Sequence, residues 1–242
     1  MIRGVLLDDK KKLLLNFIDY LKNFKHDFKS QLFQDIFASF IIGENFDKTF
    51  LEFGATNGID LSNTFTLEKD LSWSGALAEP DNNWIDSLKK NRPNSKIITK
   101  CIWSKSGEKM NFFSSDVGAL STLDDFKNSD IKSMPANTAL RIKSGKNIEV
   151  ETISLNQVIV EEFNDNSPSY ISIDTEGSEF EILNSFNFSK YHPAVFTIEH
   201  NFTDFQNKID QLMLDNNYIR IFRELTAFDA WYISSKAFDK LG

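Results

Sequence analysis

Residues 51–58 read LEFGATNG, a short apolar run followed by a turn that contains two glycines and a small alanine. Gly54 and Gly58 can adopt backbone conformations that a Cβ forbids, and such a turn lets the backbone approach a ligand closely. Amide groups at the start of the next helix can also bind an anion. The stretch therefore predicts a strand that ends in a ligand-binding turn around Ala55, within an α/β domain.

A second segment, ALAEP at residues 76–80, is another apolar run that ends in polar residues. Its Glu79 comes 21 residues after Gly58, near the spacing of about 20 residues expected for an acid that binds ribose hydroxyls. A carboxylate suits this role because it accepts hydrogen bonds from both hydroxyls of a diol. Together, the turn and the Glu79-Pro80 segment predict an adenosine-type pocket over residues 50–81, with an ordinary turn and a surface glutamate as the alternative.

S-Adenosylmethionine is the adenosine cofactor that we expect in this pocket. Its methionine carboxylate matches an anion site at the turn, and Glu52 is placed to orient loop amides or to contact its ammonium group. The third strand ends near Ile102, which we expect to pack against the adenine ring. Beside it, Cys101 is interpreted as a small buried apolar residue.

From residue 49 onward, short apolar runs alternate with helical stretches, which is typical of a parallel sheet buried on both faces. The predicted strands span residues 49–53, 74–78, 96–102, 170–173, 194–198, 218–223 and 230–233. The predicted helices between them span residues 63–70, 83–91, 155–163 and 178–186. The last two strands form a terminal antiparallel hairpin. This order predicts a Rossmann-like class I methyltransferase fold with a mostly parallel seven-stranded sheet.

Two further segments frame this domain, which we assign to residues 46–242. Residues 1–45 are predicted as an N-terminal helical extension because apolar residues recur at steps of three and four from Leu13 onward. A second helix in this extension is expected to start near Ser30, a candidate N-cap. Residues 105–150 are rich in serine, asparagine, lysine and aspartate, and we interpret them as an inserted loop region that forms a substrate lid.

Polar side chains follow two later strands at the edge where ligands bind in doubly wound sheets. Asp174 and Glu176 come after YISI, and Glu199 and His200 come after VFTI. Such groups can orient or deprotonate an acceptor hydroxyl, and they can also hold a hard divalent ion such as Mg²⁺. The simpler alternatives are that nearby acids such as Glu179 only begin a helix and that His200 is a structural histidine.

The composition narrows the range of partners. The chain has 242 residues, a formal net charge of −8 and one cysteine. An acidic chain has no global basic field that would recruit nucleic acid, and a lone cysteine forms no intrachain disulfide. No apolar run approaches the roughly 18 residues of a membrane span. We therefore expect a cytoplasmic protein with no nucleic-acid partner and no membrane span, either monomeric or homo-oligomeric.

Six segments together resemble, in order and spacing, the FkbM family of S-adenosylmethionine-dependent methyltransferases. They read SQLFQD at 30–35, EFGATNG at 52–58, SNTFTLE at 62–68, WSG with EP at 73–75 and 79–80, ISIDTEG at 171–177, and IEHN at 198–201. The turn lacks the fuller glycine pattern of many methyltransferases, and the insertion at 105–150 matches no motif that we can name.

This resemblance implies a class I methyltransferase fold and an active-site position for Asp174. It further implies that a helix containing Gln31 closes over the cofactor and that Asn63 and Thr64 begin the helix after the turn. Members of the family commonly methylate hydroxyls on sugars, polyketides or other small metabolites. The cofactor contacts that the resemblance implies are Glu52, Gly54, Asn57 and Glu79.

We therefore predict an S-adenosylmethionine-dependent methyltransferase that acts on a hydroxyl of a sugar, glycan or small metabolite. Asp174, Glu199 and His200 are the expected catalytic residues, with Asp174 also near the cofactor. One alternative is a non-catalytic module that binds the cofactor or another ligand on the same fold. A nicotinamide-dependent oxidoreductase is a second alternative, although the turn lacks the G-x-G-x-x-G pattern.

Overall fold

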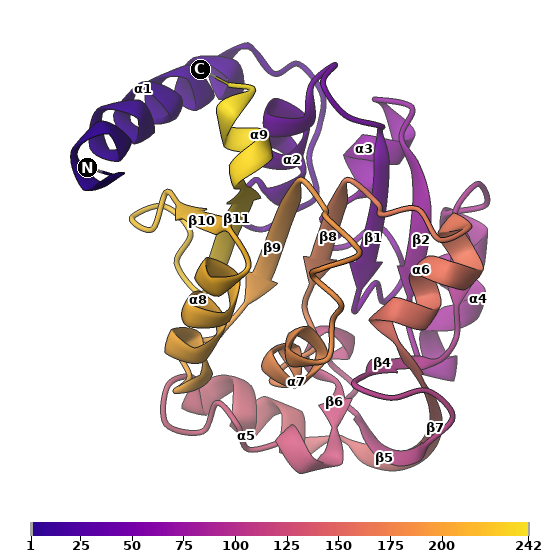
Figure 1. The fold of residues 1–242 in the computed structure, drawn as a ribbon. Coiled ribbons are helices and arrows are strands. Elements are labelled where there is room, and N and C mark those ends of the chain that lie inside the picture. Colours follow the sequence, from indigo (N-terminus) through magenta and orange to yellow (C-terminus); the bar gives the residue numbers. More distant parts are fainter. Residues whose placement is uncertain (1, 242) are drawn as a thin grey trace.

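A seven-stranded sheet forms the centre of the computed structural model, which describes the backbone of residues 2–241 and the side chains of residues 9–241 (Figure 1). From one edge to the other, its strands are β10 (Tyr218–Ile221), β11 (Asp229–Ser234), β9 (Val195–Glu199), β8 (Tyr170–Ile173), β1 (Thr49–Phe53), β2 (Ser74–Ala78) and β3 (Lys96–Ile98). Neighbours from β9 to β3 pair in parallel, whereas β11 runs antiparallel to both β9 and β10. The prediction of a Rossmann-like, mostly parallel sheet with a C-terminal hairpin is therefore confirmed.

Successive side chains of the central strands point into two different cores. In β1, Phe50 belongs to one apolar cluster and Leu51 to the other, and Tyr170 and Ile171 of β8 divide in the same way. Both faces are buried, so these strands read as continuous apolar runs rather than as alternating ones.

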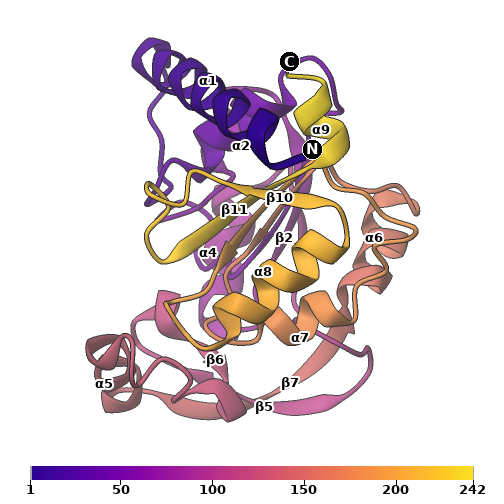
Figure 2. The same ribbon diagram turned by 60° about the vertical axis from the view of Figure 1, so that its left-hand side comes forward.

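Helices cover both faces of the sheet (Figure 2). One face packs against α6 (Leu155–Phe163), α7 (Glu179–Asn184) and α8 (Phe205–Asp215). The other packs against α1 (Ile2–Asn23), α2 (Gln34–Ile42), α3 (Phe65–Lys69), α4 (Asn82–Asn91) and α9 (Ser235–Asp239). Sequence analysis predicted neither α8 nor α9. Among residues 2–241, no helix combines the length and the apolar character needed to cross a membrane.

The N-terminal helices join the sheet through aromatic stacking. Phe37 of α2 stacks on Trp231 of β11 with ring centroids 4.5 Å apart, and Phe17 of α1 stacks on Phe222 at 5.4 Å. Phe37 and Trp231 are almost completely buried. The high phenylalanine content therefore stabilises the docking of the N-terminal segment on the sheet.

The start of α2 differs from the prediction of an N-cap at Ser30. The helix begins at Gln34, and the residue before it, Phe33, has a left-handed backbone with φ 68°. The Ser30 hydroxyl donates instead to Asp35 at 2.6 Å, and the same carboxylate oxygen accepts the Ile36 amide at 2.8 Å. Because Phe33 has this left-handed conformation, the helix does not extend back through residues 30–33.

The expected strand over residues 96–102 is two strands in two sheets. β3 ends the large sheet, and β4 (Cys101–Trp103) pairs with β7 (Lys146–Ser154) in a small sheet that also contains β5 (Lys109–Ser114) and β6 (Thr122–Leu123). Residues 105–150 are therefore not a simple loop. They also contain the short 3₁₀ segments η1 (Gly118–Leu120) and η2 (Asp124–Phe126) and helix α5 (Pro135–Lys143). Figure 1 places this insertion beyond the carboxyl ends of the central strands.

The aromatic docking gives a first prediction. Phe37→Ala should lower the free energy of unfolding by about 3–5 kcal/mol, because it removes a fully buried ring and leaves a cavity beside Trp231. Urea unfolding measures this loss. Phe28→Ala is the matched control, since the Phe28 ring is 43% exposed and its removal should cost about 1 kcal/mol. Equal losses in the two variants would contradict this account of docking.

Candidate active site

A cavity of about 320 Å³ lies at the carboxyl ends of β1, β2, β8 and β9. Many of the residues expected from the sequence line it: Gln31, Glu52, Gly54, Asn63, Glu79, Pro80, Ile102, Asp174, Glu176 and Glu199. Five others do not line it: Ala55, Asn57, Gly58, Thr64 and His200. Side chains separated by as many as 168 residues, from Gln31 to Glu199, thus meet at one edge of the sheet.

Gly54 is required by the close approach of β1 and β8. A Cβ at this position would lie 2.2 Å from the backbone oxygen of Asp174, and φ of Gly54 is +71°. Any side chain would force the two strand ends apart. The turn and the acidic edge, which are more than 100 residues apart in the sequence, are therefore in direct contact.

Glu52 organises the loop that follows the turn. Its carboxylate accepts the Asn63 amide at 2.7 Å, the Ser62 hydroxyl at 2.9 Å and the Thr64 hydroxyl. Burial raises the pKa of Glu52, and the charge of Arg92 opposes this rise. Of the two roles expected for Glu52, orienting the loop is the one that its hydrogen bonds serve.

Arg92 fixes this loop from behind, a role that sequence analysis missed. Its buried guanidinium donates to the Gly58 carbonyl at 3.1 Å and to Thr64 Oγ1 at 3.0 Å, and it pairs with Glu68 at 2.5 Å. A Cβ on Gly58 would lie 2.7 Å from Arg92 Cγ. Gly58 and Thr64 therefore shape the loop through Arg92 rather than lining the cavity themselves.

Two other turn residues also act on the local backbone. The Asn57 side chain accepts the amides of Ile59 and Asp60 at 2.9 and 3.0 Å. Ala55 is buried in the core, and its amide donates to the Ala78 carbonyl at 3.2 Å. The Asn57 side chain and the Ala55 amide therefore hold the turn in place, and neither residue lines the cavity.

Glu79 faces the cavity from the end of β2 with its carboxylate already held in position. One oxygen accepts the Thr56 amide at 2.9 Å and the other accepts the Asp81 amide at 2.8 Å. Burial raises the pKa of Glu79 to about 7. Each oxygen keeps a second lone pair, so the carboxylate can still accept hydroxyl donors.

The part of the cavity around Asn63, Glu79 and Ile102 has features that fit S-adenosylmethionine. Asn63 donates to Ser172 at 2.9 Å, but its buried Oδ1 has no hydrogen-bond partner among the described residues. A buried amide oxygen is costly to leave unsatisfied, so a ligand donor such as an ammonium group would stabilise it. Glu79 offers acceptors for a ribose, and Ile102 offers an apolar surface for a base. The residues present therefore match the chemical groups of this cofactor.

Three carboxylates that line the cavity lie close together. Oxygens of Asp174, Glu176 and Glu199 lie within 4.8 Å of one another. The Asn201 amide donates to Glu176 at 3.1 Å and to Glu199 at 2.8 Å, which fixes two of the three. Burial raises the pKa of all three acids, and the neighbouring negative charges raise each pKa further. A shared proton or a cation is the physical means of relieving this repulsion.

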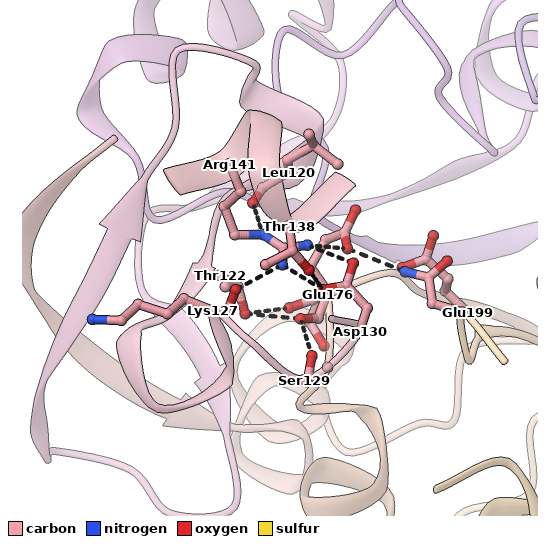
Figure 3. A network of polar contacts seen from close by, with 12 residues as sticks. Leu120, Thr122, Lys127, Ser129, Asp130, Thr138, Arg141, Glu176 and Glu199 are labelled. Atoms are coloured by element: carbon pink, nitrogen blue, oxygen red, sulfur yellow. Dashed lines mark hydrogen bonds and ion pairs between the residues drawn. The ribbon is translucent and has the colours of Figure 1, made fainter. Parts of the chain in front are cut away.

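One arginine from the insertion reaches this cluster (Figure 3). Arg141 on α5 is completely buried and donates to Glu176 at 2.7 Å. It also binds both oxygens of Asp130, at 2.8 and 3.2 Å, and the Leu120 carbonyl at 2.7 Å. Helix α5 of the insertion is thus joined through a buried ion pair to the loop that follows β8. Neither the spacing nor the composition of residues 105–150 signals this contact.

His200 lies outside the cavity although it was expected at the reacting centre. Its Nδ1 accepts the Phe202 amide at 3.0 Å, and its Nε2 lies 3.1 Å from the Asp229 carbonyl oxygen. Burial and then the charge of Arg220 lower its pKa to about 4. The neutral imidazole therefore stabilises the end of β9, and it is not one of the three residues whose ligand atoms come together.

Strand order, turn and acidic edge define the class I methyltransferase fold. The family model described as "Methyltransferase FkbM domain" matches residues 52–220. The chain belongs to this methyltransferase family, for which S-adenosylmethionine is the expected methyl donor. Comparison with curated protein sequences gives no significant match.

Several solved structures show a distant likeness. One is a TehB-like SAM-dependent methyltransferase from Corynebacterium glutamicum, with 8% identity, a TM-score of 0.41 and coverage of 93% of this chain and 98% of that one. Another is a precorrin-6y C5,15-methyltransferase from Geobacter metallireducens, with 10% identity, a TM-score of 0.38 and coverage of 77% and 78%. Identities of 8% and 10% and TM-scores below 0.5 make both likenesses distant.

The Arg141 contacts give a second prediction. Arg141→Met should lower the free energy of unfolding at pH 8 by about 3–5 kcal/mol, because Asp130 and Glu176 lose their buried partner. Folding raises the pKa of Glu176, and Arg141 opposes this rise. An acid whose pKa is raised by folding destabilises the folded state as pH rises from its unfolded pKa to its folded pKa, and without Arg141 this cost of ionising Glu176 is larger. The loss should therefore be smaller at pH 5 than at pH 8, as measured by urea unfolding.

Lys143→Met is the control for this experiment. It removes the same charge from an exposed position of α5, and it should change stability by less than about 0.5 kcal/mol at either pH. A loss for Arg141→Met that matches this control would show that the buried pair does not stabilise the insertion.

Proposed function

We propose that this protein transfers the methyl group of S-adenosylmethionine to a hydroxyl of a sugar, glycan or small metabolite. The observation that carries the proposal is that one cavity is lined both by the Gly54 turn and by the clustered carboxylates of Asp174, Glu176 and Glu199. An O-methyltransferase needs both a donor pocket and a proton acceptor within reach of the acceptor hydroxyl. Two expectations from the sequence stay predictions. One is that the protein is cytoplasmic, and the other is that an N-terminal extension of residues 1–45 precedes a methyltransferase domain of residues 46–242.

The residues proposed to hold the cofactor come from β4, the end of β2, the loop between β1 and α3, and the segment before α2. Glu79 would accept hydrogen bonds from the ribose hydroxyls, and Ile102 would pack on the adenine. The Oδ1 atom of Asn63 would accept a hydrogen bond from the ammonium group. Gln31 and Pro80 would complete the wall of the pocket. When bound, the cofactor supplies a methyl group activated by a positively charged sulfur.

Asp174 and Glu199 are the residues proposed to act on the acceptor. Glu176 is paired with Arg141, which also pairs with Asp130, so this one cation offsets part of the negative charge around Glu176. Asp174 and Glu199 lack a cationic partner among the described residues, and burial and the surrounding acids raise the pKa of both. Such a pair can take up the proton that a hydroxyl loses during alkylation.

A divalent cation is a second candidate for balancing these acids. Carboxylate oxygens are the ligands that Mg²⁺ prefers, and oxygens of Asp174, Glu176 and Glu199 lie within 4.8 Å of one another. We propose proton uptake as the first candidate, because Arg141 already supplies one positive charge to the cluster. Methyl transfer that persists in EDTA supports proton uptake, and activity that returns only with Mg²⁺ supports the metal.

Calorimetry tests the donor pocket and separates it from a nicotinamide site. We expect S-adenosylhomocysteine to bind and NAD not to bind. Glu79→Gln should weaken S-adenosylhomocysteine binding by about 10- to 100-fold, because buried charge-assisted hydrogen bonds are lost. Wild-type affinity should also fall as pH drops below about 7, where the Glu79 carboxylate takes up a proton, and the variant should lack this part of the pH dependence. Tight NAD binding without S-adenosylhomocysteine binding would contradict the proposal.

Methyl transfer tests the acidic side against a non-catalytic binding module. With radiolabelled S-adenosylmethionine and a panel of glycans, polyols and hydroxylated metabolites, Asp174→Asn should reduce turnover by about 100-fold or more. Asp116→Asn, an exposed aspartate outside the cavity lining, is the control and should keep wild-type turnover. A folded Asp174→Asn variant with unchanged turnover would remove Asp174 from the mechanism.

A further inference from the structure

The insertion supplies a wall of the cavity that is almost entirely apolar. Its lining residues are Phe112, Val117, Gly118, Ala119, Leu120, Ser121, Leu123, Asn137 and Leu140. Ser121 and Asn137 are the two polar members, and both are uncharged. The proposed donor residues lie on other segments, so this wall is available to the acceptor.

Among the residues whose side chains are described, the charged side chains that line the cavity are all acidic. The lining contains the acids Glu52, Asp60, Glu79, Asp174, Glu176 and Glu199, and no lysine or arginine lines it among the residues whose side chains are described. Arg141 lies just behind the wall, but its guanidinium is fully buried and bound to Asp130, Glu176 and backbone carbonyls. Next to the acidic cluster, an anionic group would therefore meet the carboxylates of Asp174, Glu176 and Glu199 without a free cation.

Three large apolar side chains that line the cavity are also open to solvent. Leu61, Val117 and Leu140 are 47%, 44% and 49% exposed, respectively. Leu61 lies on the loop after the Gly54 turn, and the other two lie on the insertion. Exposed apolar side chains gathered at a cavity are typical of a surface that a ligand covers.

We propose that the acceptor is a non-anionic hydroxyl compound that carries an apolar group, such as an alkyl or aryl portion, next to the hydroxyl. The apolar group contacts Leu61, Val117 and Leu140, while the hydroxyl faces Asp174 and Glu199. This inference rests on the proposed methyl transfer and specifies the class of acceptor for that same site.

Electrostatic repulsion and apolar contact both favour an uncharged acceptor that carries an apolar group. Phosphates and carboxylates must lose water and approach buried negative charge, so sugar phosphates and sugar acids are excluded by repulsion. An uncharged hydroxyl meets no such penalty. An apolar tail that covers the equivalent of two methylene groups on the rim would improve binding by about tenfold.

Three probes with the same glucose ring separate these effects in the protein saturated with S-adenosylhomocysteine. They are octyl β-D-glucopyranoside below its micelle threshold, methyl β-D-glucopyranoside and glucose 6-phosphate. By calorimetry, we expect the octyl glucoside to bind at least about tenfold more tightly than the methyl glucoside. Glucose 6-phosphate should bind more weakly than either. Binding of the phosphate as tight as that of the octyl glucoside, or no advantage from the tail, would overturn the proposal.

Two variants on one helix locate the apolar contact. Leu140→Lys should abolish the advantage of the octyl tail, whereas Ile142→Lys should keep it. Ile142 is 48% exposed on the same helix but does not line the cavity, so it matches Leu140 in exposure and in the charge introduced. Equal effects of the two variants would contradict a contact at Leu140.

Binding of S-adenosylhomocysteine tests the proposed methyl transfer, and binding of the glucosides tests the proposed acceptor class. If S-adenosylhomocysteine itself does not bind the folded protein, the proposed methyl transfer is contradicted. If it binds and none of the glucosides binds, the donor pocket stands and the proposed acceptor class is contradicted.

Discussion

The contact between Gly54 and Asp174 is the constraint on which the rest of the site depends. The backbone oxygen of Asp174 occupies the space that a Cβ at residue 54 would need, with only 2.2 Å between them. β1 and β8 can therefore end side by side, which places the turn against the acidic edge. The proposed donor pocket and the carboxylates share one cavity because these two strand ends touch.

The second constraint on the site is the negative charge of its clustered carboxylates. Carboxylates gather where the strands end, and Arg141 compensates part of this charge from an insertion about 35 residues earlier in the sequence. The same guanidinium binds the Leu120 carbonyl, so the wall of the cavity and the acidic cluster share one anchor. Folding of the insertion and the ionisation of Glu176 are consequently linked.

Local sequence was enough to predict the sheet. β1, β2 and β8 match the predicted strands residue for residue, because each is a mostly apolar run that is largely buried on both faces. The break between β3 and β4 was not predictable from apolar character, since β4 leaves the large sheet to pair with β7 about 50 residues later. Nonlocal pairing of this kind has no local pattern.

The site was predicted where a residue type follows directly from its place at a strand end, as for Glu79 and Asp174. The sequence was less informative where the role of a side chain depends on its hydrogen-bond partners. His200 stands at a strand end like Glu199, but the Phe202 amide and the Asp229 carbonyl hold its ring outside the cavity. Arg92 and Arg141 gave no sequence signal, because each works through carbonyls and acids that only the folded chain brings together.

The most direct test of this account is a crystal structure with S-adenosylhomocysteine. We predict the ribose at Glu79, the adenine at Ile102, and the sulfur directed toward Asp174 and Glu199 on the insertion side of the cavity. A ligand bound elsewhere, or bound in this cavity with its sulfur directed away from the acidic cluster, would contradict the central claim that one cavity joins the donor pocket to the proton acceptors.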